Sequence, residues 1–130
     1  MKILTAKETY ERTKIIEKRK KEKLKNEIRH LSKRKEKRMM RDIMDSINYF
    51  SENNQEYYHL NTDRQFITEN IGIKLLNLGY DLICYRDLNH NAALKISWAE
   101  NAQGKIFFNK FTEEMQEISL NELLNIMYDD

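Results

Sequence analysis

Two segments of the chain carry apolar side chains at helical spacing. The pattern is dense in residues 39–50, and in residues 67–78 the apolar positions recur at spacings of four, four and three. Such spacing places the side chains on one helix face, which then packs on a core. The two sets are Met39, Met40, Ile43, Met44, Ile47 and Phe50, and Ile67, Ile71, Leu75 and Leu78. We predict helices at both, the second with an N-cap among residues 61–63 and Gly79 as its C′ glycine.

The N-terminal third predicts a long helix. Thr5-Ala6-Lys7-Glu8 has the form of a capping box, and no Gly or Pro interrupts residues 6–50. A helix that continued unbroken to Phe50 would hold about 46 residues and extend roughly 69 Å. The sequence leaves open a break near Thr13 or Ser32.

Alternating apolar and polar residues predict β-strands in the second half. We expect strands at 56–60, 80–87, 92–99 and 105–111, the middle two joined as a hairpin. After them, Ser119-Leu120-Asn121-Glu122 has the form of a second capping box, with Ile118 and Leu123 placed as a hydrophobic staple. This signal predicts a short helix over 120–128.

These elements predict an α+β fold: a long N-terminal basic helix, a second helix packed on a small antiparallel β-meander, and a short C-terminal helix. Apolar positions are sparse in residues 14–38. We therefore expect residues 1–38 to project as a basic helix from a small α+β domain of residues 39–130.

Charge is divided unevenly along the chain. Residues 1–41 hold 17 Lys and Arg against 6 Asp and Glu, a net charge of +11, whereas residues 42–130 hold 6 against 15, a net charge of −9. The overall charge of +2 conceals this asymmetry. A division of this kind indicates an interaction arm or charge pairing between copies of the chain.

Two basic clusters are the candidate contact residues for a partner or for phosphate groups. They lie about 15 residues apart, roughly four helical turns, so a continuous helix could present both on one side. Phosphate backbones attract such arrays through counterion release. The interspersed glutamates are also typical of a solvated helix, and the acidic half of the chain could pair with the clusters in an oligomer. The candidates are Lys18, Arg19, Lys20, Lys21, Lys33, Arg34, Lys35 and Arg38.

Residue types that carry catalysis or bind metal do not form a recognisable pattern. His30, His59 and His90 lack metal-ligand spacing, and no phosphate-binding loop or nucleophile motif occurs. Cys84 is expected to be a buried structural cysteine, and as the single cysteine it fits a reducing compartment. We predict no enzymatic activity, no catalytic residue, no cofactor and no metal.

Adjacent aromatic residues occur in two of the predicted strands. Neighbouring side chains on a strand point to opposite faces, so Tyr57 and Tyr58 must separate, as must Phe107 and Phe108. One member of each pair is expected in the core. The other needs a second cover, supplied by another element or another subunit.

Two short motifs in the chain carry a resemblance to known proteins, which implies an origin for this protein. The helix over 67–78 ends in Leu78-Gly79-Tyr80, and the hairpin closes with Ile96-Ser97-Trp98. Residues 40–98 with these motifs resemble small uncharacterised proteins of tailed phages and large DNA viruses. The resemblance implies a viral origin and transfers no functional residue.

These observations lead to two hypotheses. The first is a viral accessory or virion-associated protein that acts through protein–protein contact or self-assembly by its basic helix. The second is a nucleic-acid-binding protein that uses this helix as an electrostatic arm for DNA or RNA. No apolar run approaches the length of a bilayer span and no secretory signal is evident. We therefore expect no membrane association and a location in the host cytoplasm or the virion.

Overall fold

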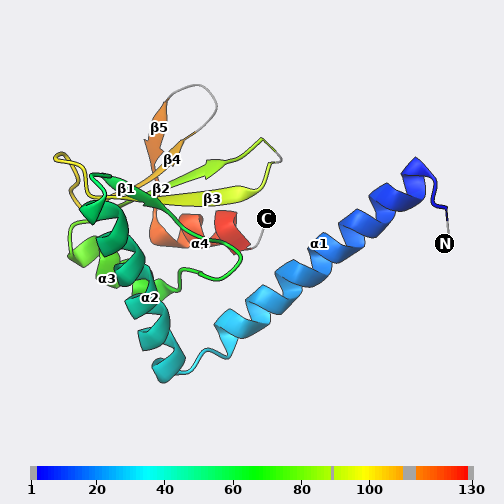
Figure 1. Ribbon diagram of the computed structural model, residues 1–130, viewed down its shortest axis with the longest axis horizontal. Coiled ribbons are helices and arrows are strands. Elements are labelled where there is room, and N and C mark those ends of the chain that lie inside the picture. The colour runs from blue at the N-terminus through cyan, green and yellow to red at the C-terminus, as the bar shows by residue number, and fades with distance from the viewer. Residues whose placement is uncertain (1–2, 89, 110–113, 129–130) are drawn as a thin grey trace. The chain divides into compact units, whose positions relative to one another are not determined.

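The computed structural model describes residues 3–88, 90–109 and 114–128, and the chain divides into two compact units, Met1–Leu31 and Ser32–Asp130 (Figure 1). The first unit contains one helix, α1 (Ala6–Arg29). The second has the element order α2 (Lys33–Glu52), β1 (Tyr57–His59), α3 (Glu69–Asn77), β2 (Asp81–Arg86), β3 (Ala92–Ser97), β4 (Ile106–Asn109), β5 (Met115–Glu117) and α4 (Leu120–Tyr128). The predicted α+β class with a long N-terminal and a short C-terminal helix is confirmed.

The long N-terminal helical region is two helices. Ser32 begins α2 as its N-cap, because its Oγ accepts a hydrogen bond from the Lys35 backbone N–H at 3.2 Å. The break falls near Ser32, one of the two positions that the sequence left open. The boundary between the two units lies between Leu31 and Ser32, whereas the predicted boundary followed residue 38.

Five strands form one mixed sheet in the order β1-β3-β2-β4-β5. The predicted hairpin is confirmed, since β2 and β3 pair antiparallel. However, β4 pairs parallel with β2, on the edge away from β3, so the three strands do not form the expected meander. The Asp81 carboxylate helps to direct the chain across the sheet end, because it accepts the backbone N–H groups of Gln103 at 3.0 Å and Lys105 at 2.9 Å. The strand β5 was not predicted.

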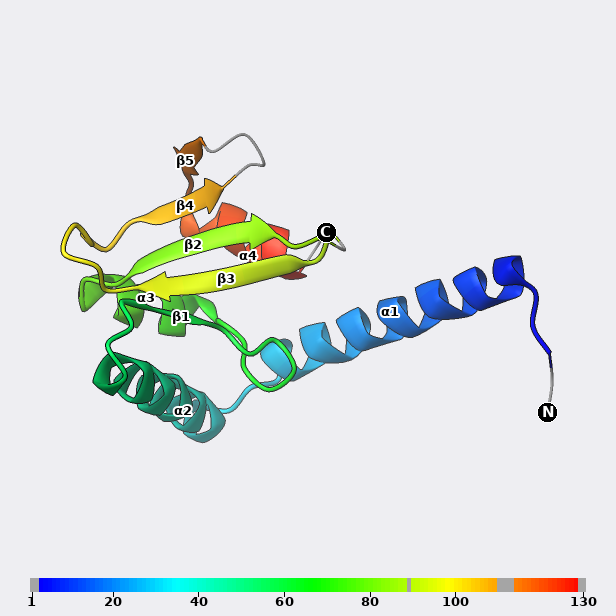
Figure 2. The ribbon, with the colours of Figure 1, turned by 45° about the horizontal axis from the view of Figure 1, so that its top comes forward.

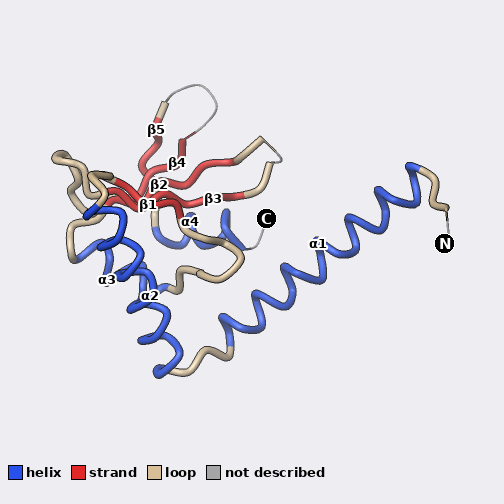
Figure 3. The backbone as a smooth tube through the Cα atoms, viewed as in Figure 1, coloured by secondary structure: helices blue, strands red, loops and turns tan. Residues whose placement is uncertain are grey.

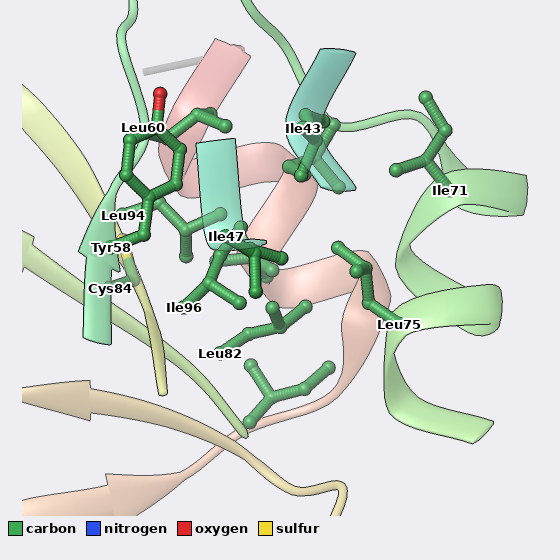
Figure 4. Close-up of a cluster of buried hydrophobic side chains, with 13 residues drawn as sticks. Ile43, Ile47, Tyr58, Leu60, Ile71, Leu75, Leu82, Cys84, Leu94 and Ile96 are labelled. Carbon is green, nitrogen blue, oxygen red and sulfur yellow. The ribbon is translucent and has the colours of Figure 1, made fainter. Parts of the chain in front are cut away.

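One face of this sheet packs against helices of the same unit. Figures 1 and 2 show α2, α3 and α4 on one side of the strands, which Figure 3 draws in red. Side chains of alternate strand residues meet the apolar faces of these helices in the core (Figure 4). The core includes Ile43 and Ile47 of α2, Ile71 and Leu75 of α3, Leu123 of α4, and Tyr58, Leu82, Cys84, Leu94, Ile96 and Ile106 of the sheet.

Local capping explains where the shorter helices begin and end. Thr68 caps α3 by accepting the Ile71 backbone N–H at 3.1 Å, so this helix begins later than predicted and Ile67 is buried in the segment before it. Gly79, with φ of 95°, is the predicted C′ glycine, and the following Tyr80 N–H bonds the Leu75 carbonyl at 3.1 Å. Leu78 departs from its predicted core position and is 63% exposed.

The predicted capping box of the last helix is also confirmed. The Glu122 N–H donates to the Ser119 hydroxyl and the Ser119 N–H donates to the Glu122 carboxylate, both at 3.2 Å. At its other end, the Tyr128 hydroxyl accepts the Ile67 N–H at 2.7 Å. These contacts fasten α4 to the segment that leads into α3.

Candidate functional site

The first predicted basic cluster lies on α1, where it does not form a single face. Consecutive helical residues are rotated by about 100°, so Lys18, Arg19, Lys20 and Lys21 point around the helix. A different set shares one face, with spacings of seven, four, three, four and four. This set, called the α1 basic stripe below, is Lys7, Lys14, Lys18, Lys21, Lys25 and Arg29.

The α1 basic stripe is long and regular. At 1.5 Å per residue it extends about 33 Å, within about a quarter of the helix circumference. Its members are exposed, apart from a half-buried Lys25. Lys14 pairs with Glu17 at 3.6 Å, and its Nζ also lies 5.5 Å from the centre of the Tyr10 ring. Lys18 and Lys21 of this stripe were among the predicted contact residues, and the other four were not, although the spacing of cations in threes and fours could have revealed them.

Apolar residues on α1 do not form a matching stripe. No described residue of the helix is buried, and Ile15 and Ile16 are both exposed. By helical geometry these two lie on a different side from Leu24 and Ile28. A coiled-coil seam needs apolar residues at regular heptad positions. The surface of α1 is therefore better suited to charge-based contact than to helix–helix packing.

The second predicted cluster lies on the first turns of α2. Spacings of three, one and three place Arg34, Lys37, Arg38 and Arg41 on one exposed face, opposite the buried Ile43. Lys35 points away from this set by helical geometry. Because the helix breaks before Lys33, the two clusters do not lie on one continuous helix, which corrects the prediction that both could share one side of it.

A shallow groove of about 300 Å³ brings the beginning of α2 beside α3. Lys33 and Lys37 line it from α2, and Lys74 lines it from α3 together with the amide side chain of Asn70. The Glu36 carboxylate at its wall accepts the Thr68 hydroxyl at 3.1 Å. Lys74 is 37 residues or more from the two α2 lysines in sequence. Its place beside them depends on how α2 and α3 pack, so the sequence alone did not indicate it.

One face of the sheet is turned away from α2, α3 and α4 (Figure 2). This face carries an aromatic cluster. Pairing places His59 opposite Lys95, Lys95 opposite Ile83 and Ile83 opposite Phe107. Their neighbours along each strand point into the core, so by strand alternation this row lies on the other face. The surface, called the open sheet face below, comprises Tyr57, His59, Ile83, Tyr85, Lys95 and Phe107.

Side-chain contacts fix the rings on the open sheet face. The Tyr85 hydroxyl lies 2.8 Å from His59 Nδ1, and the His59 ring meets Tyr57 and Tyr85 edge-on at centroid distances of 5.2 and 5.8 Å. Tyr85 on β2 pairs with Ala93 on β3. Because alanine is small, it leaves room for the Tyr85 ring to reach His59 on β1 across β3. Lys95 Nζ lies 5.1 Å from the centre of the Tyr57 ring. Partial burial and the charge of Lys95 lower the pKa of His59.

The expected separation of the aromatic pairs is confirmed in β1. Tyr58 is 6% exposed in the core, while Tyr57 is 40% exposed on the open sheet face. Phe107 and Phe108 point to opposite faces and are both half-buried. The strand predicted over 105–111 extends to Phe111, which lies outside the described residues. Trp98 donates its indole N–H to the Gln55 carbonyl at 3.0 Å.

Residues that the sequence offered for other chemistry do not assemble. Among the described residues, His, Cys, Asp and Glu form no group of three or more that could hold a metal ion. Cys84 is fully buried, and burial raises the pKa of its thiol to about 11, which keeps it in the unreactive protonated form. Over the same described ranges, no helix combines the length and apolarity needed to cross a membrane.

The chain matches no known family model, no curated protein and no solved structure with which it was compared. The candidate surfaces are therefore defined by their own geometry. They are the α1 basic stripe in one unit, and in the other unit the open sheet face and the α2 face that carries Arg34, Lys37, Arg38 and Arg41.

Proposed function

We propose that this protein binds nucleic acid, with the α1 basic stripe in contact with the phosphate backbone. The observation that supports this is the regular array of six cations along one side of an unburied helix. Phosphates recur at short, regular intervals along a nucleic acid strand, and each neutralised phosphate releases counterions. A contact of this kind needs no reading of base sequence and no pre-formed pocket.

The salt dependence of binding tests this proposal. Six phosphate contacts give a slope of log K against log salt of about −5 for duplex DNA and about −4 for a single strand. A variant with Lys14, Lys18, Lys21 and Lys25 all changed to Gln should flatten the slope by about 3 to 4. Gln keeps the helix propensity close to that of Lys.

Another side of the same helix supplies a matched control. Arg12, Arg19, Lys20 and Lys23 lie outside the stripe by helical geometry, so changing these four to Gln removes the same charge. This control should change the slope by less than about 1. Equal losses in both variants would show that net charge, and not the stripe, governs binding. Absence of binding at low salt would refute the proposal.

The charge asymmetry supports a second candidate, an assembly or accessory role through protein contact. Residues 42–130 carry a net charge of −9, which offers α1 an oppositely charged surface on another copy or on a partner protein. The resemblance to phage and large-DNA-virus proteins would place such a role in the host cytoplasm or the virion. Under this candidate, the chain is a non-enzymatic viral accessory or virion-associated protein.

Native mass measurements separate the two candidates. The full chain is compared with a form beginning at Ser32, the first residue of the second unit, after circular dichroism has verified that this form is folded. Self-assembly through α1 predicts a concentration-dependent mass that falls to a monomer on truncation. An unchanged oligomeric state would exclude α1 as the assembly element.

A further inference from the structure

We propose that the open sheet face binds the unpaired bases of single-stranded nucleic acid. The α1 basic stripe does not distinguish single strands from duplexes, because it contacts phosphates alone. The open sheet face is a separate surface in the other unit, and it would add preference for a strand whose bases are free to stack. The inference goes beyond the proposed function and rests on different residues.

Ring positions on this face suit base stacking. Tyr57 is 40% exposed, and Tyr85 and Phe107 are half-buried with their ring positions set by strand pairing. Hydrogen bonding between Tyr85 and His59 holds two of the rings before any ligand arrives. Aromatic side chains stack with any base, and one such contact is worth about 1–3 kcal/mol. Fixed rings lose little conformational entropy on binding.

Among the aromatic side chains of the open sheet face stands one lysine, Lys95, whereas carboxylates lie toward the ends of the face and include Asp87, which raises the pKa of Tyr85 after the larger effect of burial. Lys95 stands in the central strand row between His59 and Ile83, where its ammonium group can pair with a phosphate that joins two stacked nucleotides. Asp81, near the end of the face, already accepts two backbone N–H groups through its carboxylate. Glu117 lies at the far β5 end of the row. The ammonium group of Lys95 therefore lies among the aromatic rings, where a phosphate between stacked bases would be placed.

The size of the face argues against a second protein molecule as its occupant. Five strands of three to six residues, at about 4.8 Å between strands and about 3.3 Å per residue, give a flat area of roughly 350 Å². A protein partner would have to extend beyond this face, because a stable interface buries about 800 Å² of accessible surface per partner. Two or three nucleotides fit the face itself.

The test compares a short single-stranded oligonucleotide with its duplex of equal length. The double variant Tyr57→Leu and Phe107→Leu removes two rings and keeps apolar side chains on the strands. Loss of one to two base stacks should weaken single-strand binding by about tenfold or more and leave duplex binding within about twofold. Tyr49→Leu is the control for the loss of an exposed ring, because this tyrosine is 62% exposed on α2 and is not a member of the open sheet face, although it lines a hollow with Tyr58 and His59.

Each outcome is decisive. Unchanged single-strand binding, or equal losses for single strand and duplex, would overturn the inference. A dimer that the double variant abolishes without loss of oligonucleotide binding would assign the face to self-docking instead. If the double variant does not fold, photocrosslinking of the unaltered chain to a 4-thiouridine oligonucleotide replaces it, with a crosslink at Tyr57 or Phe107 as the expected result and the absence of any crosslink on the open sheet face as the refutation.

Failure of this inference is distinguishable from failure of the proposed function. The α1 stripe variant should weaken single strands and duplexes alike, whereas the sheet variant should weaken single strands alone. Loss through the sheet variant with no effect of the stripe variant would retain the inference and reject the α1 contact.

Discussion

Gln65 connects helix α2 to strand β1, and exchanging its amide for a carboxylate should destabilise the second unit. The side chain is 5% exposed. Its Oε1 accepts the Tyr58 hydroxyl at 2.5 Å and the Asn61 N–H at 3.2 Å, while its Nε2 donates to the Asp42 carboxylate at 3.0 Å and the Ser46 hydroxyl at 3.3 Å. In Gln65→Glu the shape is kept, but an oxygen replaces the nitrogen that faces Asp42.

The cost has two parts. A hydrogen bond to a charged group contributes about 1.5–3 kcal/mol, and this bond is lost. Two carboxylates at this separation also repel, by about 1 kcal/mol once the exposure of Asp42 to solvent is considered. We expect the free energy of unfolding to fall by about 2–4 kcal/mol at pH 7, which lowers Tm by about 10 °C or more.

Urea and thermal unfolding at pH 7 and pH 4 measure the effect. The destabilisation should shrink at pH 4, because protonation of the introduced carboxyl restores a donor toward Asp42. The swapped pair, Gln65→Glu with Asp42→Asn, returns an amide donor opposite the new carboxylate and should recover at least half of the loss. A single variant that costs less than about 0.5 kcal/mol, or a swapped pair no better than the single, would refute this account of the network.

Three further predictions concern the backbone at Gly104, the thiol of Cys84 and the imidazole of His59. Gly104→Ala should destabilise the second unit more than the control Gly79→Ala, whose cost is about 1–2 kcal/mol. Both residues have positive φ, but an added Cβ at Gly104 would lie 2.4 Å from the Leu76 carbonyl oxygen, whereas at Gly79 it would meet nothing within 4 Å. Equal losses of Tm in the two variants would contradict this prediction. Cys84 should react with iodoacetamide at pH 8 only at the rate of unfolding, and rapid labelling of the native chain would contradict its burial. The pKa of His59 is lowered in the folded state, so its contribution to stability should be complete above about pH 6.5 and decline as pH falls below it. His59→Gln should remove this part of the pH dependence of the unfolding free energy, and an unchanged profile would contradict it.

Local signals in the sequence were sufficient for the elements that local interactions define. The Ser119 capping box and the Gly79 terminus were predicted because a few adjacent residues satisfy the helix ends. The β2–β3 hairpin was predicted because its strands alternate around a short turn. The break before Lys33 was foreseen as an option, since Ser32 is a favourable N-cap, but propensity alone could not choose between a cap and a continuous helix.

The open sheet face was not predictable, because it depends on strand order. His59 and Tyr85 are 26 residues apart and meet only because β1 pairs with β3. Alternation along a strand identifies which side chains share a face, but it does not identify the neighbouring strand. The aromatic pairs therefore indicated an uncovered surface without indicating which rings would share it.

Strand β4 is the element that makes this arrangement possible. In a meander, β4 would occupy the edge of β3 that β1 uses, and Tyr57 would lose its place beside Lys95. The loop before β4 instead crosses the sheet end, held by Asp81 and closely packed where Gly104 approaches Leu76. Weakening that loop should therefore disturb a surface to which it contributes no residue. Single-strand binding and the stability of the second unit should decline together in Gly104→Ala, whereas contact through α1, in the other unit, should be preserved.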